Sequence, residues 1–198
     1  MTTDAINTDR RRFLAAATTA VGAAGVVGVA IPFVGSWNPS AKAKAAGAPV
    51  KADVSKLEPG QMVTVEWRGM PVYIVNRTEA QLEELPKLDP QLKDPDSKVS
   101  EQPPYIEGPD RSIKPNMLVI VGLCTHLGCA PKYIPEIGAI SVSGGEWQGG
   151  FFCPCHGSTF DMSGRVFNGV PASANLVVPP YTYETDSVII IGEDMEAA

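Results

Sequence analysis

Residues 124–129 read Cys-Thr-His-Leu-Gly-Cys, and residues 153–158 read Cys-Pro-Cys-His-Gly-Ser. We call these stretches box 1 and box 2. Together they hold all four cysteines and both histidines of the 198-residue chain. Chance would scatter six such residues along the sequence, so their clustering indicates a metal site or a disulfide framework. The two boxes therefore predict where the chemistry of this protein takes place.

Each box places cysteine and histidine side chains on one tight loop, and two such loops can face one metal centre between them. A zinc ion held by two cysteines and two histidines fits the ligand count. A [2Fe–2S] cluster, with two thiolates on one iron and two imidazoles on the other, fits it as well. A purely disulfide framework is the third interpretation.

Two features favour the cluster over zinc. A centre with two thiolates needs only one cysteine from each box, and each box has two. The spare cysteine of each box, Cys129 or Cys155, could join the two loops by a disulfide. Structural zinc fingers are usually cytosolic, where such a bridge would be reduced. The single residue between Cys124 and His126 is also a tighter spacing than zinc ligands usually have.

The boxes resemble those of Rieske iron–sulfur proteins, in the form that occurs in the quinol-oxidising cytochrome bc complexes. The resemblance covers both boxes completely and extends to Trp-Arg-Gly-x-Pro-Val at residues 67–72. It implies a disulfide between Cys129 and Cys155. It also implies one [2Fe–2S] cluster, whose ligands would be Cys124, His126, Cys153 and His156.

The chemistry explains why a cluster of this kind has imidazole ligands. Two neutral imidazoles in place of thiolates raise the potential to about −150 to +300 mV, against about −400 mV for plant-type ferredoxins. If Nδ1 of each histidine binds iron, Nε2 stays free, and its pKa depends on the charge of the iron. An oxidised cluster favours a deprotonated imidazole and a reduced cluster a protonated one. Such a site takes an electron and a proton together, as quinol oxidation requires.

The resemblance implies roles for the residues around the ligands. His156 is expected to contact the quinol, with His126 exposed beside it and Leu127 packed toward the quinone pocket; the alternative for this leucine is a place in the core. The Ser158 hydroxyl is expected to donate to a cluster sulfur, which raises the potential. Relatives often have a tyrosine with a similar role two residues further on. Phe160 has no donor, so we predict a lower potential than in those relatives.

A proline-containing loop is expected to shield the cluster from water. By resemblance it is formed by Gly169, Val170 and Pro171. The family commonly has Gly-Pro here, so Val170 is an additional residue. Because of this additional residue, we expect the geometry of the loop to differ from the family pattern.

The N-terminal segment predicts export and a membrane span. Arg10 and Arg11, followed by Phe13-Leu14, match a twin-arginine export signal. The simpler interpretation is a basic start that orients a membrane helix, but a folded cofactor protein is the cargo of that export route, so we favour export. Residues 13–34 carry no charge, and at about 1.5 Å per residue they span a hydrocarbon core of about 30 Å.

The expected fold is an all-β Rieske domain of antiparallel sheets with a cluster-binding subdomain, preceded by one transmembrane helix. Ala41-Lys42-Ala43 resembles a signal-cleavage site, but the resemblance implies an uncleaved anchor, which we favour. The expected segments are a cytoplasmic N-terminus with the twin-arginine motif (1–12), a transmembrane helix (13–35), a flexible tether (36–50) and the Rieske domain (51–198), with its cluster-binding part at about 117–172.

Local patterns place the first elements of the head. Residues 61–67 alternate apolar and polar side chains, Arg68-Gly69 makes a turn, and residues 71–75 return as a second strand, which predicts a β-hairpin. Residues 78–81 form a capping box for a short helix that we expect to stop at Pro86. Residues 86–115 are charged and proline-rich with little periodicity. We expect them to be an ordered insertion packed on the domain.

Both boxes follow apolar runs. Residues 117–123 lead directly into box 1, and Phe151-Phe152 lead into box 2. We therefore expect both ligand loops to emerge from strands at one end of a β structure, which holds the cluster near the surface. Residues 181–191 predict a closing hairpin.

The function implied by the resemblance is that of the Rieske subunit of a ubiquinol–cytochrome c reductase. Such a subunit accepts an electron and a proton from ubiquinol, passes the electron to a c-type cytochrome and contributes to proton translocation. The implied partners are cytochrome b and cytochrome c1 in a complex expected to be dimeric. The implied location is the bacterial inner membrane, single-pass, with the soluble domain on the periplasmic side. A net charge of −6 and no basic stripe argue against nucleic acid.

Three alternatives come from other classes. The first is the small Rieske subunit of a periplasmic oxidoreductase of the arsenite oxidase type, which would lose its signal and would not need the insertion at 86–115. The second is a soluble Rieske ferredoxin, which the membrane segment and the spare cysteines disfavour. The third is a zinc-stapled structural domain, which would be colourless and redox-silent.

Overall fold

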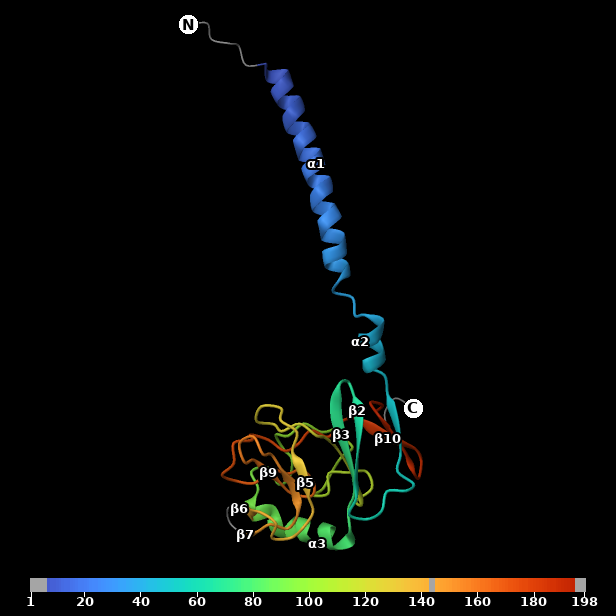
Figure 1. Ribbon diagram of the computed structural model, residues 1–198, viewed down its shortest axis with the longest axis vertical. Coiled ribbons are helices and arrows are strands. Elements are labelled where there is room, and N and C mark those ends of the chain that lie inside the picture. Colours follow the sequence, from blue (N-terminus) through green and yellow to red (C-terminus); the bar gives the residue numbers. More distant parts are fainter. Residues whose placement is uncertain (1–6, 143–144, 195–198) are drawn as a thin grey trace. The chain divides into compact units, whose positions relative to one another are not determined.

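The computed structural model describes residues 7–142 and 145–194 and divides the chain into two compact units, residues 1–45 and 46–198. The first unit contains a long helix. The second is the head, built from several small antiparallel sheets (Figure 1). The expected fold class, a mostly β Rieske-type domain preceded by an apolar helix, is confirmed.

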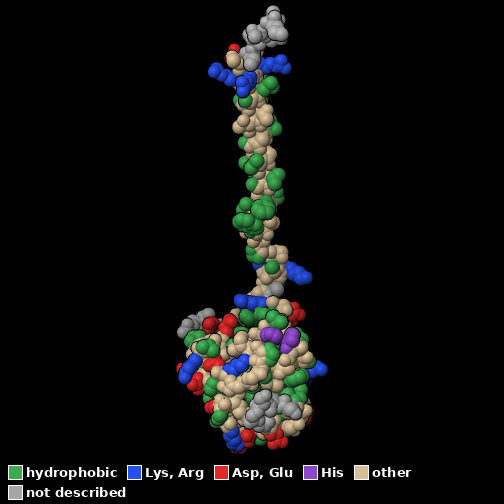
Figure 2. Space-filling view, turned by 90° about the vertical axis from the view of Figure 1, so that its left-hand side faces the viewer, with side chains coloured by type: hydrophobic (Ala, Val, Ile, Leu, Met, Phe, Trp, Pro, Cys, Tyr) green, Lys and Arg blue, Asp and Glu red, His purple; other side chains and the backbone are tan. Residues whose placement is uncertain are grey.

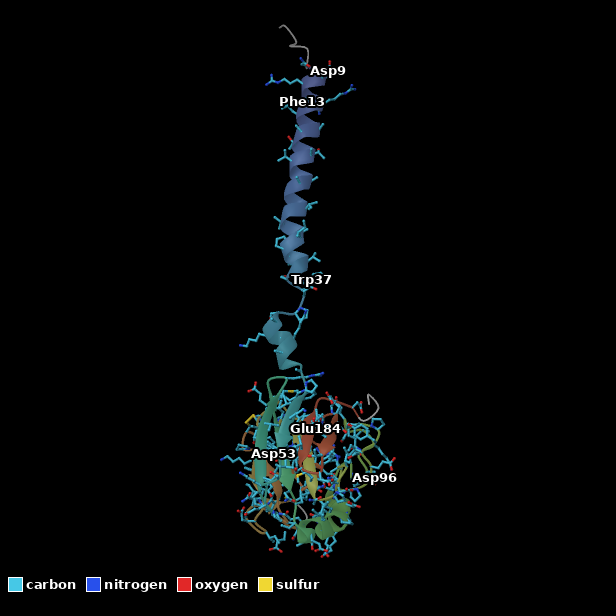
Figure 3. The ribbon with its side chains drawn as sticks, turned by 90° about the vertical axis from the view of Figure 1, so that its right-hand side faces the viewer. Asp9, Phe13, Trp37, Asp53, Asp96 and Glu184 are labelled. Carbon is cyan, nitrogen blue, oxygen red and sulfur yellow. A yellow bond between two sulfur atoms is a disulfide. The ribbon has the colours of Figure 1, made fainter. Side chains whose placement is uncertain are left out.

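Helix α1 (Thr8–Gly35) is long and apolar enough to cross a membrane. None of its residues is buried, so its apolar side chains have no protein core to pack on within the described chain. Phe13 lies near its start and Trp37 just beyond its end (Figure 3). The helix begins before the predicted span, and the arginine pair therefore lies within its first turns. Asn7 caps it by accepting a hydrogen bond from the Arg10 backbone N–H at 3.0 Å.

The segment expected to be a tether contains a short helix, α2 (Ala41–Ala46). Ser40 Oγ accepts from the Ala43 backbone N–H at 3.1 Å, as a helix-capping serine does. The lysine and alanine residues of this stretch are good helix formers, which is why a stretch interpreted as a linker forms one turn of helix.

Eleven strands are assigned within the described residues, and all their pairings are antiparallel. They form sheets in the orders β1-β11-β10, β2-β3-β4, β5-β8-β9 and β6-β7. The strands are β1 (Val50–Asp53), β2 (Met62–Trp67), β3 (Met70–Asn76), β4 (Met117–Val121), β5 (Lys132–Ile134), β6 (Ser141–Val142), β7 (Gly145–Glu146), β8 (Gly150–Phe152), β9 (Thr159–Phe160), β10 (Tyr181–Thr185) and β11 (Val188–Ile191).

The sheet β2-β3-β4 positions box 1. Its hairpin pairs Trp67 with Met70 across Arg68 and Gly69, which have φ of 53° and 73°, as a tight hairpin turn requires. Strand β4 is buried along its whole length, and box 1 begins three residues after its last residue, Val121. The predicted hairpins at both ends of the head are confirmed.

Helix α3 (Glu79–Leu88) begins with the predicted capping box, in which Thr78 and Gln81 each accept from the other's backbone N–H. The prediction that it stops at Pro86 is wrong. This proline lies in the last turn, where its missing N–H removes only one bond, and the buried Leu85 and Leu88 on either side hold the turn against the core. The chain then continues as a 3₁₀ helix, η1 (Asp89–Gln91).

The insertion is packed on the domain, as expected, and buried arginines fasten it. Arg77 donates to Ser163 Oγ at 2.6 Å, and Arg111 donates to the Ser163 carbonyl at 3.0 Å. Arg165 pairs with Asp161 inside the turn at 161–165 and with Asp89 of the insertion, each at 2.7 Å, and Arg77 also donates to Ser112 Oγ of the insertion at 2.7 Å. All three guanidinium groups thus meet the turn at 161–165 that follows box 2. Burial lowers the pKa of Arg77 and of Arg111 to about 10, so both stay charged at neutral pH.

One core joins the sheets. Ile74 and Ile120 of the β2-β3-β4 sheet and Phe151 and Phe160 of the β5-β8-β9 sheet are all fully buried in the same cluster. The part of the head that carries the boxes is therefore not an independent domain. Its loops are held by the packing of the whole head.

Candidate metal centre

Box 1 is a closed loop at the end of β4. The Cys124 N–H donates to the Cys129 carbonyl at 2.8 Å, and the Gly128 N–H donates to the Cys124 carbonyl at 2.9 Å. Gly128 has φ of 79°, a conformation that glycine adopts without steric cost. The glycine thus turns the chain back so that the two ends of the box are bonded to each other.

Box 2 has the same backbone arrangement at the end of β8. The Cys153 N–H donates to the Ser158 carbonyl at 2.7 Å, and the Gly157 N–H donates to the Cys153 carbonyl at 3.0 Å. Gly157 has φ of 77°. The first and the last residue of each box are therefore fixed by the same pair of hydrogen bonds.

The four expected ligands lie together. Cys124 and Cys153 are free thiols, and both are buried. The rings of His126 and His156 have centroids 4.8 Å apart and are nearly perpendicular, at 86°. Figure 2 shows the two histidines side by side on the surface of the head. The structure thus brings together two thiols below the surface and two imidazoles at it.

The state of the imidazoles and thiols fits an iron–sulfur cluster. Nδ1 of His126 is buried and has no hydrogen-bond partner within the described residues, which costs about 1–3 kcal/mol unless a ligand meets the nitrogen. Burial raises the pKa of the Cys124 thiol, and the adjoining Cys153 thiol adds to the rise, against the opposing hydrogen bonds of the His126 backbone and the Ser158 hydroxyl. Metal binding deprotonates such thiols.

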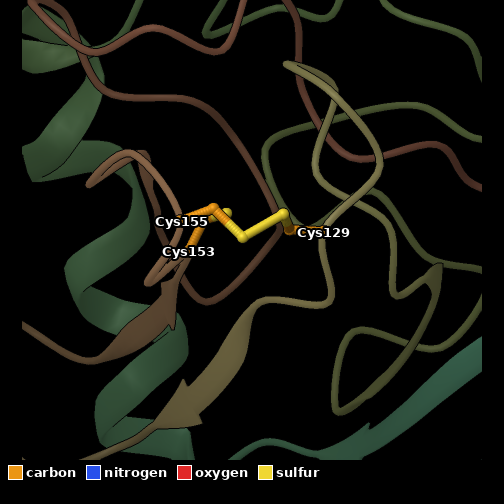
Figure 4. Close-up of side chains that lie close together, drawn as sticks. All are labelled: Cys129, Cys153 and Cys155. Carbon is orange, nitrogen blue, oxygen red and sulfur yellow. A yellow bond between two sulfur atoms is a disulfide. The ribbon is translucent and has the colours of Figure 1, made fainter.

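The expected disulfide between Cys129 and Cys155 is present and joins the two boxes (Figure 4). The sulfurs of Cys129, Cys153 and Cys155 lie within 4.8 Å of one another. Two of the three belong to the disulfide, so this group of sulfurs is not itself a set of three ligands. Its consequence is that the candidate ligand Cys153 lies directly beside the cross-link, which holds the loops together with or without a metal.

The two histidines differ in how far they are exposed to solvent. His156 is exposed and His126 is half-buried. Leu127 is 73% exposed, so its alternative place in the core is excluded, whereas its contact with a quinone stays a prediction. An exposed apolar side chain beside two surface imidazoles suits an apolar partner with hydroxyl groups.

Ser158 and Phe160 lie beneath the boxes, and both are fully buried. Ser158 Oγ accepts from the Ala172 N–H at 3.0 Å, and the serine is among the groups that counter the rise in the pKa of Cys124. Its expected tuning role stays a prediction. Phe160 belongs to β9 and pairs with Phe151 of β8. It brings no polar atom to the site from its side chain.

The chain that directly follows the predicted covering loop at 169–171 is bonded to both boxes. Thr125 of box 1 donates from its hydroxyl to the Ala174 carbonyl at 2.6 Å, while Ser158 of box 2 holds Ala172. Val170 is half-buried against the core, and Pro171 is exposed. Sequence reasoning missed Thr125, although a hydroxyl placed between two ligands was a signal that could have been used.

Loops that carry paired cysteines and histidines at strand ends, joined by a disulfide, define a Rieske-type [2Fe–2S] domain. Residues 48–182 match the family described as "Rieske [2Fe-2S] domain", and this range contains both boxes. Residues 1–40 match the family described as "Ubiquitinol-cytochrome C reductase Fe-S subunit TAT signal". The second match bears out the twin-arginine interpretation.

Curated relatives give the narrower assignment. The "Ubiquinol-cytochrome c reductase iron-sulfur subunit" of Allochromatium vinosum is 54% identical over 198 residues, covering 100% of this chain and 95% of the relative. The protein of the same name from Blastochloris viridis is 44% identical and covers 96% of each chain. The chain belongs to this family of iron–sulfur subunits. A solved chain described as "Hyperthermophilic respiratory Complex III" is 25% identical, covers 88% of this chain and 98% of its own length, and has a TM-score of 0.48.

Proposed function

We propose that this chain, as the Rieske subunit of ubiquinol–cytochrome c reductase, takes one electron and one proton from ubiquinol at the exposed edge of its histidine pair and passes the electron to a c-type cytochrome. The observation that supports this most is the adjacency of two surface imidazoles, with ring centroids 4.8 Å apart, above two buried free thiols. The family of the chain agrees with it.

The residues that would hold the cluster come in equal number from the two boxes. The sulfurs of Cys124 and Cys153 and Nδ1 of His126 and His156 are the proposed ligand atoms. When bound, the cluster supplies a one-electron acceptor at a potential raised by its two neutral ligands. The partnerless, buried Nδ1 of His126 supports this assignment.

The exposed ring edge is the proposed contact for the substrate. Nε2 of His156 accepts a hydrogen bond from the quinol hydroxyl and then holds its proton, because this ring is the more exposed of the two. His126 stands beside it in the half-buried position. Leu127 offers apolar area to the quinol ring, since it is 73% exposed next to the imidazoles.

Anchoring and orientation follow from α1. An uncharged stretch of this length is long enough to span a membrane, and the arginines in its first turns favour the cytoplasmic side for its start. The head would then lie on the periplasmic side of the bacterial inner membrane, and residues 36–50 would serve as the tether. The proposed partners are cytochrome b and cytochrome c1 in a dimeric complex. The net charge of −6 gives no support for nucleic acid binding.

The experiment that tests this function is a reduced-minus-oxidised optical spectrum of the protein extracted from membranes in mild detergent. We expect b-type and c-type haem bands to accompany it, together with the electron paramagnetic resonance signal of a Rieske cluster. An iron–sulfur signal without haem, on a protein that has lost its first 40 or so residues, would instead support the small subunit of a periplasmic oxidoreductase. Nothing in the comparisons favours that alternative.

A further inference from the structure

We propose that Lys93 is a positioning residue of the cluster site: it clamps the covering loop at 169–172 so that this loop fixes Ser158, and it thereby raises the redox potential. This inference rests on the proposed function, because it needs a cluster between the boxes. Lys93 belongs to the insertion, far from both boxes in sequence, and nothing in the sequence pattern assigns it a role.

The contacts of Lys93 are those of a clamp. Its Nζ donates to the Val170 carbonyl at 2.7 Å and to the Ala172 carbonyl at 2.6 Å. These carbonyls stand on either side of the exposed Pro171. An ammonium group has three donors and no acceptor, and hydrogen bonds from a charged donor are stronger than those between neutral groups. One side chain thus fixes both ends of the tip of the loop.

The backbone of Lys93 is itself held in place. Its N–H donates to the Val166 carbonyl at 3.0 Å, and the Asn168 N–H donates to the Gln91 carbonyl at 2.8 Å. Between these bonds, Leu92 forms an antiparallel bridge with Phe167, and both side chains are buried. The insertion therefore lies against the chain that enters the loop, and it presents the ammonium group from a fixed base.

The loop depends on this clamp. Within the described part of the chain, residues 169–173 take part in no hydrogen bond between two backbone groups. The loop is held instead by side chains, of which Lys93 makes two bonds and Ser158 one. The clamp acts on the carbonyl of Val170, whose side chain is half-buried against the core.

The clamp reaches the site through Ala172 and Ser158. Ala172 is fully buried; its carbonyl accepts from Lys93, and its N–H donates to Ser158 Oγ at 3.0 Å. That bond uses the serine oxygen as an acceptor and leaves the hydroxyl hydrogen free, so that it can serve as the donor to a cluster sulfur expected of Ser158. A donor to a cluster sulfur favours the reduced, more negative state and so raises the potential.

The test replaces Lys93 in the full-length chain purified with its complex in mild detergent. Lys93→Met keeps the length of the side chain and removes both the donors and the charge. We expect its midpoint potential to shift to lower values in a redox titration followed by paramagnetic resonance. We also expect hydrogen exchange at the hydrogen-bonded amides of Asn168 and Ala172 to become about tenfold faster, because the loop opens locally more often. Lys93→Arg, which restores charge and donors, should recover much of both losses.

The matched control is Lys87→Met. Lys87 is in the neighbouring helix α3, and its ammonium group pairs with Glu84 at 2.6 Å on the surface. This variant removes the same charge without touching the loop, and it should keep the wild-type potential and exchange. Equal shifts in the two variants would attribute the effect to charge alone and overturn the positioning role.

The remaining outcomes are also decisive. A Lys93→Met protein with a full cluster, wild-type potential and wild-type exchange would refute the clamp. If this variant does not load its cluster, Lys93→Gln provides the same comparison, because glutamine keeps a donor for one carbonyl. We expect Lys93→Gln to shift the potential by an intermediate amount. An unchanged potential in Lys93→Gln would also refute the clamp. A wild-type protein without a Rieske signal would mean that the proposed function, and not the clamp, has failed.

Discussion

Box 1 and box 2 share one backbone arrangement but carry different side chains. In each, the first N–H bonds to the last carbonyl, and a glycine at the fifth position, Gly128 or Gly157, turns the chain with φ of 79° or 77°. The last residue differs. Box 1 ends in Cys129, which forms the disulfide, and box 2 ends in Ser158, which holds the Ala172 N–H.

The histidines differ by one position along this common frame. His126 is third in its box, and His156 is fourth. The shift leaves the first ring half-buried and the second exposed. The comparison teaches that two copies of one loop can place their histidines close together while leaving only one of the two rings exposed. The third residue of box 2 is Cys155, which forms the disulfide, whereas the third residue of box 1 is His126.

The largest effect is expected from replacing either of the two cysteines that are proposed as ligands. Cys124→Ser and Cys153→Ser should each abolish the cluster, because a serine oxygen is a poor replacement for a thiolate on iron. Iron content and the paramagnetic resonance signal measure the loss. A signal of wild-type size in either variant would show that the boxes do not contribute one thiolate each.

The second effect concerns the cross-link. Replacing both Cys129 and Cys155 by alanine opens a loop with a sequence separation of 26 residues, and the unfolded chain should gain entropy worth about 3 kcal/mol of stability. We expect the cluster to assemble but to bleach at a lower temperature than in the wild type. Absence of the cluster at low temperature would show that the disulfide is needed to form the site and not only to stabilise it.

The third effect tests the common backbone directly. Gly128→Ala and Gly157→Ala add a methyl group that meets nothing within 4 Å, so only the left-handed backbone conformation is penalised. Each should cost about 1 kcal/mol of stability, and the two costs should be equal within the error of a thermal bleaching experiment. Clearly unequal costs would break the equivalence of the two loops.

The smallest effect on stability is expected from Phe160→Tyr. A hydroxyl added at this buried residue of β9 would supply the donor that family members with tyrosine have, and we expect a higher midpoint potential with the cluster content unchanged. An unchanged potential in a redox titration would contradict the proposed tuning role of this position.

Much of the centre could be predicted from the sequence because its chemistry is local. The spacing of cysteine and histidine within each box, with a glycine where the loop must turn, is readable without any knowledge of distant contacts. The hairpin at Arg68-Gly69 and the capping box at 78–81 are equally local, and both are confirmed.

What could not be predicted depends on contacts between distant segments. No sequence pattern predicts the burial of Arg77 and Arg111, which the carbonyl and hydroxyl acceptors of the turn at 161–165 make possible. Helix α3 passes Pro86 because Leu85 and Leu88 are buried there. Lys93 has no motif around it, and its bonds are visible only once residues 91–93 lie against residues 166–168.

The sheet β1-β11-β10 has a consequence for the biogenesis of the protein. Val50, in the first strand of the head, pairs with Ile191 in the last strand. The ribosome makes β11 long after β1, so the sheet closes only when nearly all of the head has been synthesised. Pairing across such a separation is intrinsically slow. On the proposed periplasmic placement of the head, export as a finished fold, which the match of residues 1–40 supports, would wait for that last strand and would follow translation.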